Sequence, residues 1–190
     1  MSNNAGPTSL ILLSGLILLA AVSRLLPHPP NFGPVGAIAL FGAAALPRRW
    51  MAVVVPFAAL YLSDLLLNNF LYGQYYDGFY AGFNGWVYAG FALTIVLGWA
   101  TVRGEQWSLT RIGGSAVLAT VLFFGLTNFG VWAGSAMYPP TLVGLLACYA
   151  AGLPFLVNSL AGNLLFAGAL FGIAGYFFKL APHASTASVS

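Results

Sequence analysis

The chain has 190 residues, of which 60% are hydrophobic and only 5% are charged: six Lys or Arg and three Asp or Glu. A soluble domain is typically about 25% charged, so this composition excludes an ordinary water-soluble globular protein. It also excludes a disordered chain, because disorder requires low hydrophobicity and high net charge.

Apolar runs separated by Gly, Pro and polar residues predict six helices in chain order. A membrane-spanning helix needs roughly 20 mostly apolar residues. The strict apolar/polar alternation of a membrane β-barrel strand is missing from runs such as 10–21 and 51–62. The predicted fold is therefore all-α, a polytopic membrane helical bundle with about six transmembrane helices. These helices are expected at residues 8–26, 34–46, 49–69, 82–102, 109–128 and 154–178.

One apolar segment, 141–152, is too short to span a membrane and is bracketed by Pro139, Pro140 and Pro154. It is expected to form a short re-entrant or interfacial helix, or to extend a neighbouring helix. The bundle is predicted to be one integral membrane domain over residues 1–180, followed by a flexible tail at 181–190.

The positions of the cations predict the orientation of this bundle, because Lys and Arg accumulate in cytoplasmic loops. With six crossings and both termini in the cytoplasm, five of the six cations lie inside and Arg24 alone lies outside. The expected location is therefore the inner (plasma) membrane. The five inner cations are Arg48, Arg49, Arg103, Arg111 and Lys179.

Several functions lack the residues that they need. The one lysine, Lys179, has no phosphate-binding loop around it, so the chain is not itself a P-loop ATPase. His28, His183 and Cys148 are far apart, so no metal site, catalytic residue or cofactor is predicted. The cations are scattered, which argues against nucleic acid as a partner. The chain is predicted not to be an enzyme.

The polar residues that remain gather toward the predicted outer side, where they are expected to form a substrate-binding pocket. Asp64 would orient a polar or cationic group, asparagines would offer hydrogen bonds, and aromatic side chains would form walls. The segment 27–32 would act as a lid. The predicted substrate-binding residues are Asn31, Asp64, Asn128, Trp132, Tyr138, Tyr149, Asn158 and Asn163, and the lid or ion-pair residues are Arg24, His28 and Phe32.

Several of these residues also have a structural interpretation, in which they stabilise the bundle and do not bind a ligand. A purely structural ion pair between Asp64 and Arg24 is weighed equally with ligand binding by Asp64. Asn158 and Asn163 are weighed as interhelical hydrogen-bond partners. The aromatic residues between 70 and 86 are weighed first as a membrane-interface belt.

Several short motifs resemble an uncharacterised bacterial membrane family. They are RLLPHPPNFGPVGA at 24–37, Ser63-Asp64, TNFGVW at 127–132, Tyr138-Pro139, GLLACY at 144–149 and LPF at 153–155. That family is described as similar to the substrate-binding S components of energy-coupling factor (ECF) transporters. Its pattern carries an acid in the last helix where this chain has Asn163.

The resemblance implies a six-helix protein that captures a vitamin-like or other small solute from outside. Its partners would be the lipid bilayer, a transmembrane coupling subunit and cytoplasmic ATPases that drive uptake. The alternatives are a structural or accessory subunit of a larger membrane assembly and, less favoured, an intramembrane enzyme using Asp64 and His28.

Overall fold

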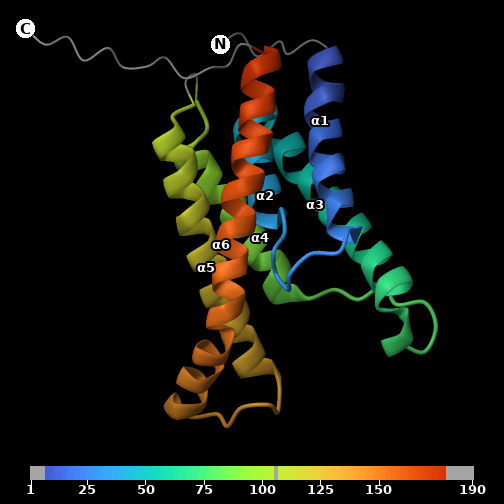
Figure 1. Ribbon diagram of the computed structural model, residues 1–190, viewed down its shortest axis with the longest axis vertical. Coiled ribbons are helices and arrows are strands. Elements are labelled where there is room, and N and C mark those ends of the chain that lie inside the picture. Colours follow the sequence, from blue (N-terminus) through green and yellow to red (C-terminus); the bar gives the residue numbers. More distant parts are fainter. Residues whose placement is uncertain (1–6, 105–106, 179–190) are drawn as a thin grey trace, which may run out of the picture.

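The computed structural model describes residues 7–104 and 107–178, and the predictions for Lys179 and the tail at 181–190 lie outside the described residues. Six α-helices pack into one elongated bundle (Figure 1). A 3-10 turn follows α1, and a π-helical turn and a second 3-10 turn follow α3. The elements are α1 Pro7–Val22, η1 Ser23–Leu25, α2 Val35–Ala45, α3 Arg49–Leu66, η2 Leu67–Leu71, η3 Gly73–Tyr75, α4 Gly85–Thr101, α5 Leu109–Gly134 and α6 Leu142–Phe178.

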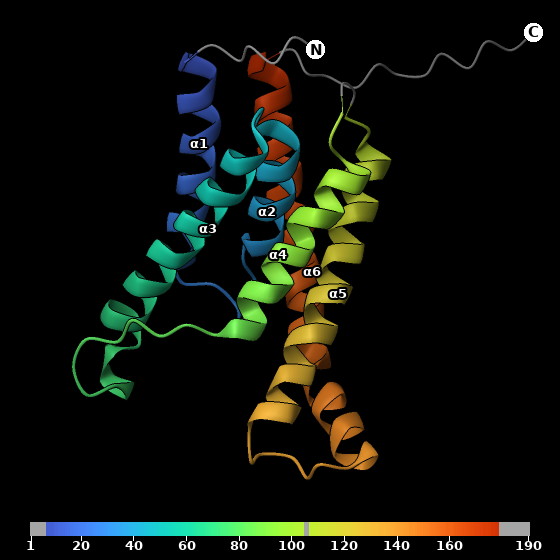
Figure 2. The same cartoon turned by 180° about the vertical axis from the view of Figure 1, so that it is seen from behind.

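Successive helices run in alternating directions, so α1 begins and α6 ends at the same end of the bundle (Figures 1 and 2). We call this the terminal end. The connections between α3 and α4 and between α5 and α6 lie toward the opposite end, which we call the hairpin end. The segment between η1 and α2 turns back partway along the bundle.

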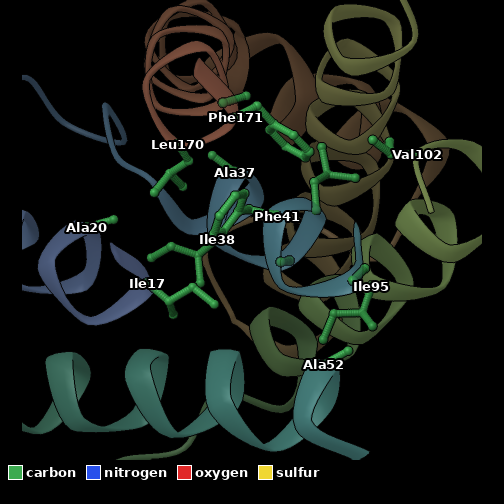
Figure 3. Packing of buried hydrophobic residues seen from close by; sticks show 14 of the residues in the cluster. Ile17, Ala20, Ala37, Ile38, Phe41, Ala52, Ile95, Val102, Leu170 and Phe171 are labelled. Carbon is green, nitrogen blue, oxygen red and sulfur yellow. The ribbon is translucent and has the colours of Figure 1, made fainter. Parts of the chain in front are cut away.

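The short helix α2 lies at the centre of the packing, and every residue from Gly36 to Ala43 is buried. A helix that is apolar all round is expected inside a bundle. A helix this short does not span a bilayer core unless the bilayer thins around it, so it is expected to be buried in the bundle, to thin the bilayer locally or to cross only part of it. The structure shows that it is buried. Figure 3 shows Ile38 and Phe41 of α2 among Ile17 and Ala20 of α1, Ile95 of α4, and Leu170 and Phe171 of α6.

Small residues allow the helices around α2 to approach closely. A Cβ added at Gly98 of α4 would lie 2.7 Å from the Cβ of Ala43, and one added at Gly42 would overlap Pro56 of α3. Between apolar helices in lipid, close packing supplies attraction that hydrophobic transfer does not. The small-residue face of α2 is therefore used within the chain itself.

Of the alternatives predicted for residues 141–152, the structure shows extension of a neighbouring helix. Residues 142–152 are not a separate re-entrant or interfacial helix, because α6 runs unbroken from Leu142 to Phe178 with Pro154 inside it. Proline removes one backbone hydrogen bond and bends a helix without ending it when packing holds both sides. Figure 1 shows the first, orange part of α6 turned away from the rest. Likewise α5 continues past the predicted end at 128 to Gly134.

Four helices are long and apolar enough to cross a membrane: Pro7–Leu25, Arg49–Leu71, Leu109–Gly134 and Leu142–Phe177. The helices α2 and α4 are apolar but shorter. With 37 residues, α6 is roughly 55 Å long at about 1.5 Å per residue, more than a bilayer core of about 30 Å requires. These lengths indicate a membrane protein.

At the terminal end, Arg103 holds the last turn of α2. Its guanidinium donates to the carbonyl oxygens of Ala43 at 3.0 Å and Pro47 at 2.8 Å. Partial burial, with Arg49 nearby as a second cause, lowers the pKa of Arg103 below its usual range. This cation therefore satisfies carbonyls that the end of a helix leaves without partners.

Candidate functional site

A cavity of about 730 Å³ extends from the α5–α6 connection into the middle of the bundle. Its walls come from α5 and α6 on one side and from the segment 24–36 on another, with single residues of α3 and α4 closing the rest. Most lining side chains are apolar or aromatic, and a few polar groups are interspersed. The polar and aromatic lining residues include Arg24, His28, Asn31, Phe32, Tyr72, Asn84, Thr120, Phe123, Phe124, Thr127, Asn128, Tyr138, Phe155, Ser159 and Asn163.

One face of α6 supplies a whole wall of the cavity. Cys148, Gly152, Phe155, Ser159 and Asn163 line it and follow each other at spacings of four, three, four and four residues. Side chains at these spacings stack on one side of a helix. A corresponding face of α5, from Thr120 through Phe124, Thr127 and Val131, also lines the cavity.

Seven of the predicted residues line this cavity. Four come from the predicted substrate-binding set and three from the predicted lid or ion-pair set, and they approach from distant parts of the sequence. They are Asn31, Asn128, Tyr138 and Asn163, and Arg24, His28 and Phe32.

The other four predicted residues do not line the cavity. The indole nitrogen of Trp132 donates to the Pro139 carbonyl at 3.0 Å, and the hydroxyl of Tyr149 donates to the Gly125 carbonyl at 2.6 Å. Both contacts tie the α5–α6 hairpin together. Asn158 donates to the Pro30 carbonyl at 2.9 Å, and Asp64 lies in an ion pair.

The segment predicted to act as a lid is fastened to α6. Besides the bond from Asn158, the Ser159 hydroxyl donates to the Asn31 carbonyl at 3.2 Å. Asn31 adopts a left-handed backbone with φ of 61°, a conformation that asparagine tolerates better than most residues. A Cβ at Gly162 would lie 2.7 Å from the backbone nitrogen of Gly33, so only glycine permits this approach. In this structure the segment is a packed wall of the cavity.

Asn163 forms the inner end of the cavity and joins three helices. Its Oδ1 accepts from the Ala37 backbone amide of α2 at 3.0 Å, and its Nδ2 donates to the Thr120 hydroxyl of α5 at 2.7 Å. Ala37 stands in the first turn of α2, where backbone amides have no partner within the helix, and Pro34 provides no side-chain cap. Asn163 therefore caps α2 from another helix.

A polar cluster between α1, α3 and α4 stands beside the cavity. The Arg24 guanidinium pairs with Oδ1 of Asp64 at 2.7 Å and contacts the Ser63 hydroxyl, while the Tyr88 hydroxyl donates to Oδ2 of Asp64 at 3.1 Å. Both ionic side chains are largely buried, at 16% and 18% exposure. An ionised pair held this far from water needs such hydrogen bonds to offset desolvation.

A second, more open pocket of about 510 Å³ adjoins the first on the other side of Arg24. Arg24, Asn84 and Val87 border both pockets, whereas Asp64 borders only the second. Tyr76 and Tyr80 stand at this side pocket with their rings stacked 3.9 Å apart. Asp64 thus borders the side pocket and not the main cavity.

Sequence reasoning missed Ser63, Asn84, Tyr88, Thr120, Thr127 and Ser159. The last three carried a usable signal, because Thr120 and Thr127 stand seven apart and Ser159 stands four before Asn163, which places each pair on one helix face. Ser63 and Tyr88 carried none, since their respective partners Arg24 and Asp64 are distant in the sequence. Among the described residues no group of three or more His, Cys, Asp or Glu side chains could hold a metal ion.

Comparison with known proteins adds one relationship. No curated protein and no solved structure matches the chain. A family described as a family of unknown function, DUF6580, matches residues 4–184, which is nearly the whole sequence. The chain therefore belongs to the family DUF6580.

Proposed function

We propose that the protein is the membrane-embedded substrate-capture component of an ECF-type uptake transporter for a vitamin-like or other small solute. The observation that carries the proposal is the cavity of about 730 Å³ between α5, α6 and the segment 24–36. Its size falls in the range of roughly 300 to 1,000 Å³ of small-molecule sites. Apolar and aromatic walls with a few convergent polar groups are the usual composition of such a site.

The proposed topology has six crossings of the inner membrane, with both termini in the cytoplasm. Supporting it, the ends of α2 and α4 and the starts of α3 and α5 lie at the terminal end, together with Arg48, Arg49, Arg103 and Arg111. Cations at one end of a bundle favour the cytoplasm for that end. The hairpin end, where the α5–α6 part of the cavity lies, then faces the outside.

The proposed partners supply what the chain does not encode. Its sequence has no phosphate-binding loop, so energy for uptake would come from cytoplasmic ATPases through a transmembrane coupling subunit. Its motifs resemble an uncharacterised family that is described as similar to the S components of ECF transporters, and that similarity implies this division of labour. Binding and release of the solute would be the task of this chain.

Two tryptophan variants on α6 test the proposal. Ala151 lines the cavity, whereas Ala161 is exposed and is not among the lining residues, so Ala151→Trp fills the cavity and Ala161→Trp is its matched control. Wild-type protein purified gently from its own membranes should release a small molecule detected by mass spectrometry. Ala151→Trp should release little of it, and Ala161→Trp should release as much as wild type.

Crosslinking in membranes tests the partners in the same preparations. The expected result is capture of an ATPase and a second membrane subunit by all three proteins, because the cavity is not the docking surface. A stable complex that contains neither an ATPase nor a released solute would contradict the proposal. That outcome would favour a structural or accessory subunit of a membrane assembly.

A further inference from the structure

We infer that the solute bound in the main cavity carries an anionic group, a carboxylate or phosphate, which Arg24 binds. This inference rests on the proposed function, because it assigns a chemical class to the solute of that same cavity. It replaces the sequence-based expectation that Asp64 would orient a polar or cationic group.

The charge of the cavity wall is the first observation. Among the described residues that line the cavity, Arg24 is the one Asp, Glu, Lys or Arg side chain. Asp64, its counterion, borders the side pocket and not the main cavity. A solute in the cavity therefore has a cationic residue, and no carboxylate, among the residues that line its site. A cationic solute would meet repulsion from Arg24 without a carboxylate in the wall to offset it.

The hydrogen bonds of Arg24 are the second observation. Its Nη1 contacts the Ser63 hydroxyl and, at 3.5 Å, the Leu60 carbonyl, and its Nη2 pairs with Asp64. A guanidinium has five N–H donors, so these three contacts leave two for a ligand. The same contacts hold the guanidinium in a fixed position, and a preorganised fork matches carboxylate and phosphate oxygens.

Both carboxylate oxygens of Asp64 already bind protein groups, which is the third observation. Arg24 occupies Oδ1 and the Tyr88 hydroxyl occupies Oδ2. Asn84, which borders both pockets, accepts the backbone amides of Trp86 and Val87 through its Oδ1, so its amide N–H groups remain as donors. The polar groups at this end of the cavity are thus donors, the complement of an anion.

A matched pair of variants tests the inference, since Arg24→Gln and Asp64→Asn break the same ion pair but leave opposite charges. Each protein is purified from its own membranes, checked for folding by circular dichroism and gel filtration, and denatured. The released molecules are partitioned between water and chloroform, and the aqueous phase is passed over an anion-exchange resin at pH 7 and analysed by mass spectrometry.

The expected result is an aqueous solute that the resin retains. Its amount should fall roughly tenfold or more in Arg24→Gln, as expected from losing a charged hydrogen bond, and should fall much less in Asp64→Asn, whose amide oxygen can still accept from Arg24. If Arg24→Gln fails to fold, Arg24→Lys takes its place and should lose part of the solute, because an ammonium lacks the fork.

Other results separate the two proposals. An aqueous solute that passes the resin, or one lost in Asp64→Asn and kept in Arg24→Gln, overturns the anionic assignment and leaves solute capture standing. An anionic lipid in the chloroform phase with the expected variant pattern supports anion binding by Arg24 and contradicts solute capture. Release of nothing from wild-type protein contradicts both.

Discussion

At the scale of single residues, Asn163 has the widest structural effect, because one side chain bonds α2 and α5 to α6. It is 7% exposed, and a Cβ at Gly36 would overlap its amide group. An acceptor is needed at this position to cap α2 at the Ala37 amide. Aspartate would meet that need too, since a carboxylate is favoured at a helix N-terminus. This accounts physically for an acid at the corresponding place in the resembling family's pattern.

We therefore predict different outcomes for two substitutions of Asn163. Asn163→Leu preserves much of the volume but leaves the Ala37 amide without an acceptor, and should cost about 1 to 2 kcal/mol of stability. Asn163→Asp in its protonated form keeps an acceptor for the Ala37 amide and an O–H donor for Thr120, so at acidic pH it should cost less than half of that. Thermal unfolding in detergent, followed by tryptophan fluorescence, checks the order. Equal losses for both variants would show that the cap is not what Asn163 contributes.

At the scale of elements, the contact between α6 and the segment 27–34 shapes the cavity. Two side-chain bonds and the close approach of Gly162 to Gly33 bring an irregular segment against a helix in the middle of the bundle. Non-helical backbone at such depth needs protein partners for its polar groups. The carbonyls of Pro30 and Asn31 find these partners in Asn158 and Ser159.

Two glycines of α6 test the importance of this contact. Gly162→Ala would press a methyl group against the Gly33 backbone, so it should destabilise the protein by about 1 to 3 kcal/mol and open the segment to proteolysis. Gly168→Ala is the matched control, because nothing lies within 4 Å of its added Cβ, and it should be neutral or slightly stabilising. Unfolding curves and limited proteolysis distinguish them. Equal behaviour of the two variants would contradict a tight contact.

A bend in α6 is the second feature at this scale. Pro154 removes the bond that its amide would give to the carbonyl of Ala150, and the cavity residues Ala151, Gly152 and Phe155 flank it. We predict that Pro154→Ala straightens α6. Spin labels at 143 and 173, in a Cys148→Ala background, should then lie several ångströms farther apart. Double electron–electron resonance measures this distance, which increases because a straight helix separates its ends more than a bent one. An unchanged distance would assign the bend to packing alone.

At the scale of the whole molecule, alternating helices bring the start of α1 and the end of α6 to one end and the α5–α6 hairpin to the other. The two long helices of that hairpin carry a large share of the cavity wall. From residue 112 to residue 178 the sequence has no Asp, Glu, Lys or Arg, so the part of the wall that α5 and α6 supply is uncharged. Arg24 adds the charge to this wall. Binding chemistry at this scale therefore depends on two regions far apart in the sequence.

The proposed orientation gives a prediction for intact cells. In a Cys148→Ala background, Met137→Cys lies in the α5–α6 connection, where Met137 is 72% exposed, and should react with a membrane-impermeant maleimide from outside. Gly104→Cys lies in the α4–α5 connection at the terminal end and should react only after permeabilisation. If only Gly104→Cys were labelled in intact cells, the orientation of the protein would be the opposite of the one proposed.

The helices could be predicted from the sequence because their signal is local. An apolar run of sufficient length forms a helix in lipid whatever surrounds it, since the backbone must satisfy its own polar groups. The predicted segments 34–46, 49–69 and 82–102 thus fall on α2, α3 with η2, and α4. Continuation of α6 through Pro154 was one of several alternatives that the sequence left open, because packing on both sides of the proline decides among them.

The site was predicted less completely. Three of the predicted residues that do not line the cavity share the same relation to it. Trp132, Tyr149 and Asn158 each stand one position from a lining residue, namely Val131, Cys148 and Ser159. One step along a helix turns the side chain by about 100°, so a neighbour in sequence points elsewhere. Composition identifies polar residues on a helix but does not tell which of its faces meets the cavity.

The sequence by itself determined that the chain is a bundle of apolar helices, because charge content and run length are properties of the chain. Only the tertiary structure decided that α2 is buried, that Asn163 caps it, and that Arg24 lines the main cavity while Asp64 does not. These features depend on the rotation and contact of helices far apart in the sequence. The charge that faces a solute is set by that rotation and not by the count of charged residues.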